Sequence, residues 1–95
     1  RAAGLLDRFT VIVDGNTAVD HNLRGKPAPD TYLYAASLLR LPASGCVVVE
    51  DATSGVAAGK AGEFALVIGV DRGTGADELV AAGADIVVTD LAEVL

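Results

Sequence analysis

Short runs of β-branched and aliphatic residues recur along the chain, separated by stretches in which apolar positions follow a helical spacing. The run FTVIV at 9–13 is rich in β-branched residues, and CVVV at 46–49 is too short for a helix. Two later apolar runs, FALVIGV at 64–70 and a short β-branched run at 85–88, also favour strands. The pattern therefore predicts four strands, at residues 9–13, 46–49, 64–70 and 85–88.

Helical segments are predicted between the strands. Residues 29–41 carry leucines and alanines at helical spacing behind Pro29, which suits a first turn. Residues 54–61 are rich in small side chains, and we expect Thr53 or Ser54 to cap their start. The segment 76–82 is predicted to end at the glycine that follows it.

Residues 1–8 are interpreted as the end of an earlier helix, and 91–95 as a last helical turn. Strands that alternate with helices in this way predict right-handed βαβ units. The expected fold class is α/β, with a partial Rossmann-like parallel sheet and flanking helices.

The net charge and composition of the chain exclude some classes of binding partner and some cellular compartments. A net charge of −6 predicts no nucleic-acid binding and no docking to an anionic membrane. No apolar run approaches the roughly 20 residues that span a bilayer. The chain has no recognisable signal peptide, and its one cysteine, Cys46, excludes an internal disulfide. We expect a cytoplasmic protein.

An acidic pair, Glu50 and Asp51, directly follows the predicted strand 46–49. In open α/β sheets, ligands bind beyond the carboxyl ends of the strands. Two adjacent carboxylates in such a crevice are costly unless a cation compensates their charge. Mg²⁺, which takes one or two protein carboxylates together with waters or phosphate, would do so. A solvated acidic turn explains the pair alone equally well.

A second candidate is Lys26, in the proline-rich segment GKPAPD at 25–30. It lies just before a predicted helix, whose amino end favours anions through free N–H groups and the helix dipole. A lysine there adds a compact positive charge for a phosphate. For a lone lysine, a surface position in a turn is the commoner explanation.

The two candidates together resemble a known family. GKPAPDTYLYAASLL followed by CVVVEDATSGVAAGKAG resembles motifs III and IV of the haloacid dehalogenase superfamily. The E-D form of the second segment is similar to subfamily IA, variant 3, and the whole chain is most similar to the β-phosphoglucomutase-like members and their phosphatase relatives.

The resemblance implies a role for each matching residue. Lys26 would contact the phosphoryl group as a catalytic residue, Asp51 would ligate Mg²⁺, and Glu50 would support the metal directly or through water. The start of the following helix would be ordered by Thr53, Ser54 and Gly55. The implied activity is that of a Mg²⁺-dependent phosphate-ester hydrolase or phosphomutase, acting on a small phosphorylated metabolite such as a sugar phosphate.

The chain departs from the family pattern in one respect. The resemblance implies an aspartyl-phosphate formed on the first aspartate of a D-x-D motif, and these 95 residues contain no D-x-D. The segment around Asp14 is interpreted as a loop. Because the chain also begins at Arg1, we expect residues 1–95 to be the C-terminal part of a core domain whose N-terminal strands and cap are missing. We expect this chain alone to be inactive and to hold Mg²⁺ weakly.

A structural expectation follows from the same resemblance. In the family's sheet, two strands lie between those that match 9–13 and 46–49. Because strands need neighbours for their N–H and C=O groups, the chain must leave a gap, close it, or recruit another chain. We expect the part from Cys46 onward to be the most coherent.

Two other functions remain open. A receiver-like signalling domain also gathers acids, a lysine and Mg²⁺ at strand ends, but its acidic pair comes early and its lysine late. A truncated, non-catalytic module would pair with another chain, or with a second copy, through exposed sheet edges. His21 is interpreted as a surface residue, Cys46 as a core residue, and the glycine loop 71–75 as too weak a match for a dinucleotide site.

Overall fold

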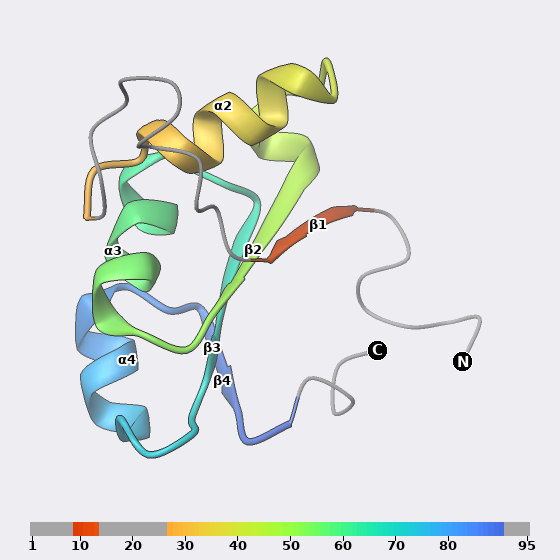
Figure 1. The fold of residues 1–95 in the computed structure, drawn as a ribbon. Coiled ribbons are helices and arrows are strands. Elements are labelled where there is room, and N and C mark those ends of the chain that lie inside the picture. The colour runs from red at the N-terminus through yellow and green to blue at the C-terminus, as the bar shows by residue number, and fades with distance from the viewer. Residues whose placement is uncertain (1–8, 14–26, 91–95) are drawn as a thin grey trace.

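A computed structural model describes residues 9–13 and 27–90. In these ranges the chain forms a parallel sheet with strand order β1-β2-β3-β4 (Figure 1). The strands are β1 (Thr10–Val13), β2 (Cys46–Glu50), β3 (Leu66–Val70) and β4 (Ile86–Val88). The helices are α2 (Asp30–Leu38), α3 (Thr53–Ala61) and α4 (Ala76–Ala82), with a short 3₁₀ helix, η1 (Ala43–Gly45). The predicted α/β class is confirmed.

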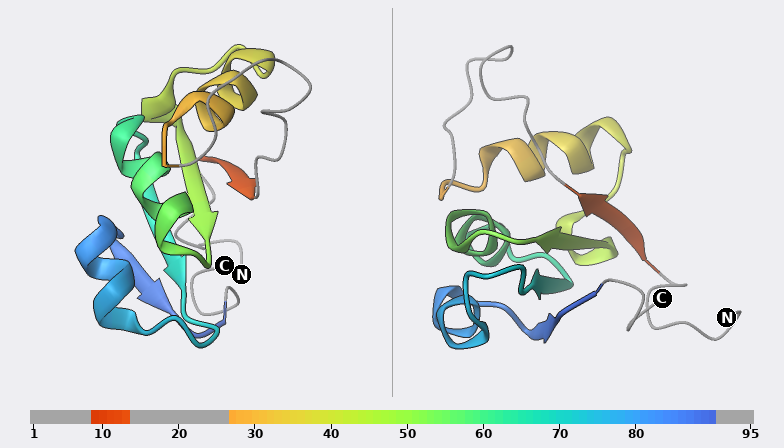
Figure 2. Two further views of the ribbon diagram at one scale, coloured as in Figure 1. Left: turned by 60° about the vertical axis from the view of Figure 1, so that its left-hand side comes forward. Right: turned by 60° about the horizontal axis from the view of Figure 1, so that its bottom comes forward.

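The three α-helices lie on one face of the sheet (Figure 2). Because successive strand residues point to opposite faces, Cys46 and Val48 of β2 pack in a cluster with residues of α2 and α3. Val47 and Val49 point the other way, into a cluster with side chains of β3 and β4. This alternation decides which way the residue at the end of β2 points.

β1 pairs directly with β2, with Thr10 opposite Cys46 and Val13 opposite Val49. The sequence left three outcomes open for these two strands: a gap between them, a closed gap, or another chain in the gap. In the described residues the gap is closed. β2 therefore has hydrogen-bonded neighbours on both sides, since it also pairs with β3.

The expected end of the first helix is wrong by three residues, because α2 ends at Leu38 rather than at residue 41. Arg40 adopts a left-handed conformation with φ of 58°. Its N–H bonds the carbonyl of Ser37, while the N–H of Leu41 bonds the carbonyl of Ala36. These two bonds form a Schellman motif, which stops the helix without a glycine.

The expected cap of the second helix is also wrong. Residue 52, an alanine, occupies the cap position of α3 and makes no side-chain hydrogen bond there, and Thr53 is already helical. By contrast, α4 spans the predicted residues, and Gly83 ends it with a φ of 122°. The predictions at residues 1–8, 14–26 and 91–95 lie outside the described residues.

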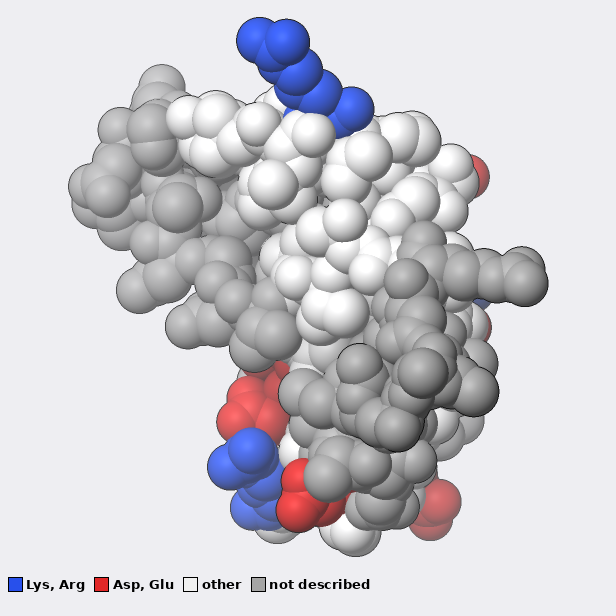
Figure 3. Space-filling view, turned by 90° about the vertical axis from the view of Figure 1, so that its right-hand side faces the viewer, with Lys and Arg blue, Asp and Glu red and all other residues white. Residues whose placement is uncertain are grey.

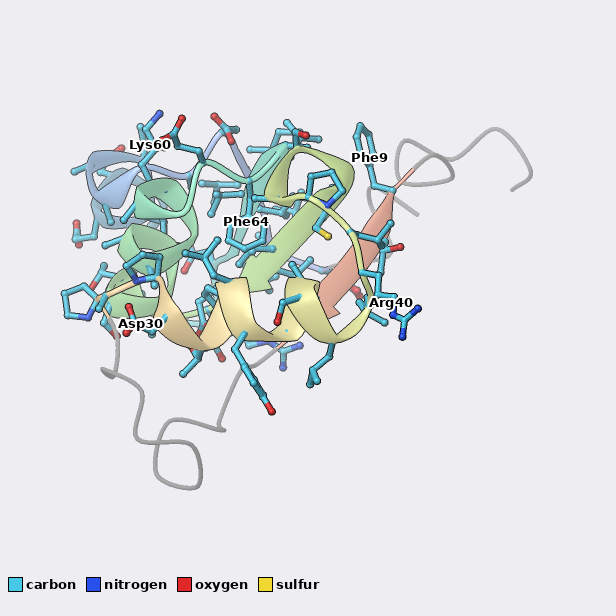
Figure 4. All side chains as sticks on the ribbon, turned by 90° about the horizontal axis from the view of Figure 1, so that it is seen from above. Phe9, Asp30, Arg40, Lys60 and Phe64 are labelled. Atoms are coloured by element: carbon cyan, nitrogen blue, oxygen red, sulfur yellow. The ribbon has the colours of Figure 1, made fainter. Side chains whose placement is uncertain are left out.

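The aromatic pair Tyr32 and Phe64 packs α2 against the segment that leads into β3. Tyr32 is fully buried, and its ring meets that of Phe64 edge to face, with 6.1 Å between centroids. Figure 4 shows Phe64 among the helices, while Arg40 and Lys60 lie at the outside. None of the helices within 9–13 and 27–90 is long and apolar enough to span a bilayer.

Neighbouring residues of α4 test this packing. Leu79 is fully buried, whereas Val80 is 57% exposed. We expect Leu79→Ala to lower the free energy of unfolding by about 2–5 kcal/mol, because it leaves a cavity. Val80→Ala should change it by less than about 0.5 kcal/mol. Urea unfolding measures both, and equal effects would contradict the packing of α4 described here.

Candidate active site

The candidate site lies where the strands end. Glu50 closes β2, Asp51 follows it, and Asp71 follows β3. Because the strands are parallel, their carboxyl ends share one edge of the sheet. Figure 3 shows acidic and basic side chains together at the lower end of the face it displays, the level at which β3 and β4 end in Figure 1.

Glu50 points toward the helices, because it lies on the same face of β2 as Cys46 and Val48. The side chain is buried, with 9% of the residue exposed. The hydroxyl of Tyr32, on α2, donates a hydrogen bond to Oε2 of Glu50 at 2.5 Å. A buried carboxylate needs such donors, and a hydrogen bond to a charged acceptor is stronger than a neutral one.

The other oxygen of Glu50 faces the start of α3. Oε1 accepts the backbone N–H groups of Asp51, at 3.2 Å, and of Ala52, at 3.3 Å. The carboxylate therefore lies beside the amino end of the helix, where the dipole favours negative charge. Its two bonds lie just before the first helical residue, and Thr53 and Ser54, the expected caps, are both exposed.

Gly55 provides the space that this carboxylate occupies. A Cβ built at Gly55 would lie 2.0 Å from Cγ and 2.1 Å from Cδ of Glu50. Real side chains essentially never approach so closely, so any other residue at this position requires Glu50 to move. The structure thus shows that Gly55 leaves the space for the glutamate, while its expected role in ordering the helix start stays a prediction.

Asp51 has the opposite environment, because its side chain is exposed. Its backbone is held on both sides. The N–H bonds Glu50, and the carbonyl accepts the hydroxyl of Thr74 at 3.1 Å. The loop after β3 thus reaches across to the residue after β2.

Asp71 organises that loop. Its Oδ1 accepts the backbone N–H groups of Gly73, at 3.0 Å, and of Gly75, at 3.1 Å. These two bonds, the one from Gly73 first, lower the pKa of the Asp71 carboxyl. The sequence alone marks this glycine loop only as a weak dinucleotide motif. The signal that could have placed it was its position, directly after a strand that neighbours β2.

Lys26 lies outside the described residues, so its approach to the acidic pair stays a prediction. Among residues 9–13 and 27–90, no group of three or more His, Cys, Asp or Glu side chains could hold a metal ion. The exposed carboxylate of Asp51 fits Mg²⁺, which often takes a single protein carboxylate and completes its shell with water and phosphate.

Cys46 is fully buried in the core, in agreement with our interpretation. Burial raises the pKa of its thiol, because a thiolate would lose its hydration there. The residue therefore lacks the exposed, electropositive surroundings of a reactive cysteine.

Comparison with known proteins gives the family. Residues 1–63 match the model of haloacid dehalogenase-like hydrolases. A β-phosphoglucomutase of Mycobacterium bovis is 54% identical over 95 residues, which are 95% of this chain and 36% of the relative.

Two solved structures share the fold. A HAD family hydrolase of Deinococcus radiodurans, with bound phosphate and sodium, superposes with a TM-score of 0.71 at 38% identity, over 80% of this chain and 35% of that one. A HAD hydrolase of family IA, variant 3, from Entamoeba histolytica gives 0.71 at 31% identity, over 80% of this chain and 34% of that one.

The chain therefore belongs to the haloacid dehalogenase-like hydrolases, and it is similar to β-phosphoglucomutases within them. It spans about a third of the length of each of these three relatives.

The loop after β3 yields a prediction on pH. Because the folded pKa of Asp71 lies below its ordinary value of 3.8, the charged carboxylate stabilises the fold above about pH 4. This contribution should be lost as the pH falls through the folded pKa. Asp71→Asn should therefore be less stable than the native chain at pH 7, and the difference should shrink at lower pH. A urea series at several pH values measures it, and a constant difference would contradict the assignment.

Proposed function

We propose that this chain supplies the phosphate-binding lysine and the cation-binding acid of a phosphate-ester hydrolase or phosphomutase. The observation that carries the proposal is the acidic pair at the carboxyl end of β2, beside the start of α3. The family supports it, as do the β-phosphoglucomutase relative and the relative whose structure holds phosphate. The proposed substrate is a sugar phosphate.

Asp51 would hold Mg²⁺ through its exposed carboxylate. When bound, the ion supplies positive charge that offsets the charge of a transferring phosphoryl group. The chain's own contribution is to fix Asp51 before any ligand arrives. Its backbone bonds to Glu50 and Thr74 do this, so the main chain that carries the carboxylate starts from a defined position.

Lys26 would provide the second positive charge. It lies six positions before Tyr32 in the sequence, and Tyr32 contacts Glu50 at the end of β2. The start of α2 is thereby tied to the end of β2. The role of Lys26 at the phosphate is proposed from the family motif and from its place in the sequence just before this helix. Two positive charges on one phosphate, from the lysine and the ion, suit the chemistry of phosphoryl transfer.

The nucleophile of the proposed reaction would come from a D-x-D segment that these residues do not contain. In that reaction an aspartate oxygen bonds to phosphorus while the ester oxygen leaves and takes up a proton. Water, or a second sugar hydroxyl, then attacks the aspartyl-phosphate and frees the carboxylate. The first outcome is hydrolysis and the second is a mutase reaction.

A simple assay tests the missing step. We expect the purified 95-residue chain not to hydrolyse p-nitrophenyl phosphate above the rate of a mock purification, with or without Mg²⁺. The reason is that the proposed reaction requires a D-x-D segment, which these 95 residues do not contain. Turnover that co-purifies with the chain, and that Asp51→Asn abolishes, would show that the chain carries its own nucleophile.

A chimera tests the proposed roles directly. This chain would replace the segment of the M. bovis β-phosphoglucomutase to which it aligns, and we expect the chimera to retain β-phosphoglucomutase activity. Lys26→Ala and Asp51→Asn should each lower kcat/KM on the order of 100-fold or more, because the first removes a positive charge from the phosphoryl site and the second removes the ligand of the ion. Lys60→Ala, an exposed lysine of α3, is the matched control and should change little. Equal losses for Lys26→Ala and Lys60→Ala would contradict the role of Lys26.

A further inference from the structure

The two adjacent acids at the end of β2 have different surroundings, although their residue types suggest one shared role. Glu50 is buried among α2, α3 and the sheet, whereas Asp51 is exposed. Both oxygens of Glu50 accept hydrogen bonds from the protein: one from Tyr32, the other from the backbone of Asp51 and Ala52.

We propose that Glu50 is a positioning residue and that Tyr32 and Gly55 keep it turned away from the cation. Tyr32 draws the carboxylate into the helix layer, and Gly55 leaves the space for it. From there, Glu50 holds the backbone N–H of Asp51. Asp51 is then the single carboxylate of the pair that faces the ligand. The assignment to a cation site rests on the proposed function, but the inward position of Glu50 does not.

The physical argument has two steps. Turning Glu50 outward would break the bond from the Tyr32 hydroxyl and leave that hydroxyl, in a fully buried residue, without this acceptor. Removing one partner of a buried pair costs more than the pair itself contributes. The turn after β2 would also lose the acceptor of two N–H groups, and with it the restraint on Asp51.

Gly55→Ala gives a test whose sign depends on where Glu50 points. If nothing occupied the space, an alanine in α3 would lower the unfolding equilibrium constant about 2- to 5-fold, because glycine is the poorer helix former. With Glu50 inward, the new Cβ collides with its Cγ and Cδ. We expect the constant to rise instead, by about 10- to 100-fold, as for other overpacked sites.

A second substitution isolates the cause. Glu50→Ala removes the atoms that collide, so in that background Gly55→Ala should leave the unfolding constant unchanged or lower it. Gly45→Ala is the matched control, since its nearest side-chain neighbour would be 3.8 Å away. All constants come from urea unfolding of the 95-residue chain, without metal or substrate. A stabilising Gly55→Ala, or a cost that Glu50→Ala does not relieve, overturns the inward position.

If Glu50→Ala does not fold, Tyr32→Phe replaces it. Gly55→Ala already displaces the carboxylate, so adding Tyr32→Phe should raise the unfolding constant no more than about twofold further. Effects that multiply in the double variant would show that the tyrosine and the glycine act independently, and would overturn the proposal.

The different roles of Glu50 and Asp51 can be tested separately through kcat/KM of the chimera. Glu50→Gln keeps oxygen and nitrogen where the carboxylate was, so kcat/KM should stay within about tenfold of the parent, while Asp51→Asn should lose on the order of 100-fold. Equal losses would make Glu50 a ligand. If the chimera is inactive, the proposed function fails, while the unfolding data still decide the position of Glu50.

Discussion

The buried carboxylate of Glu50 is the constraint on which the site depends. A charge removed from water needs donors around it, and a lone buried ion is costly. Here the donors come from two further elements: the Tyr32 hydroxyl of α2 and the backbone at the start of α3. One side chain therefore joins the end of β2 to both helices that pack beside it.

The alternation of side chains along β2 gives the two acids at its end different roles. Successive strand residues point to opposite faces of the sheet. Glu50, two positions after Val48 on β2, therefore points into the helix layer as Val48 does. The next residue, Asp51, leaves the strand and is exposed. Its backbone is fixed by Glu50 on one side and by Thr74 on the other. Adjacent acids can thus divide between holding the backbone and facing a ligand, which is the kind of support that a precise site requires.

Much of this arrangement is readable from the sequence, and the exceptions have physical reasons. Runs of valine and isoleucine predict parallel strands, and Gly83 marks the end of α4. The end of α2 was missed because Arg40, a residue with no special preference for positive φ, adopts it. Glu50 could be proposed as a candidate site residue from the sequence, because it directly follows a predicted strand. Its partner Tyr32 lies 18 residues away and becomes visible only when α2 packs on β2. The joint action of Lys26 with the pair stays a prediction, since that residue lies outside the described ranges.

The most direct measurement is a crystal structure of the chimera with Mg²⁺ and phosphate bound. The account predicts that the Asp51 carboxylate ligates the ion while Glu50 remains hydrogen-bonded to Tyr32 above Gly55. A structure in which Glu50 has left the tyrosine and coordinates the ion beside Asp51 would contradict it.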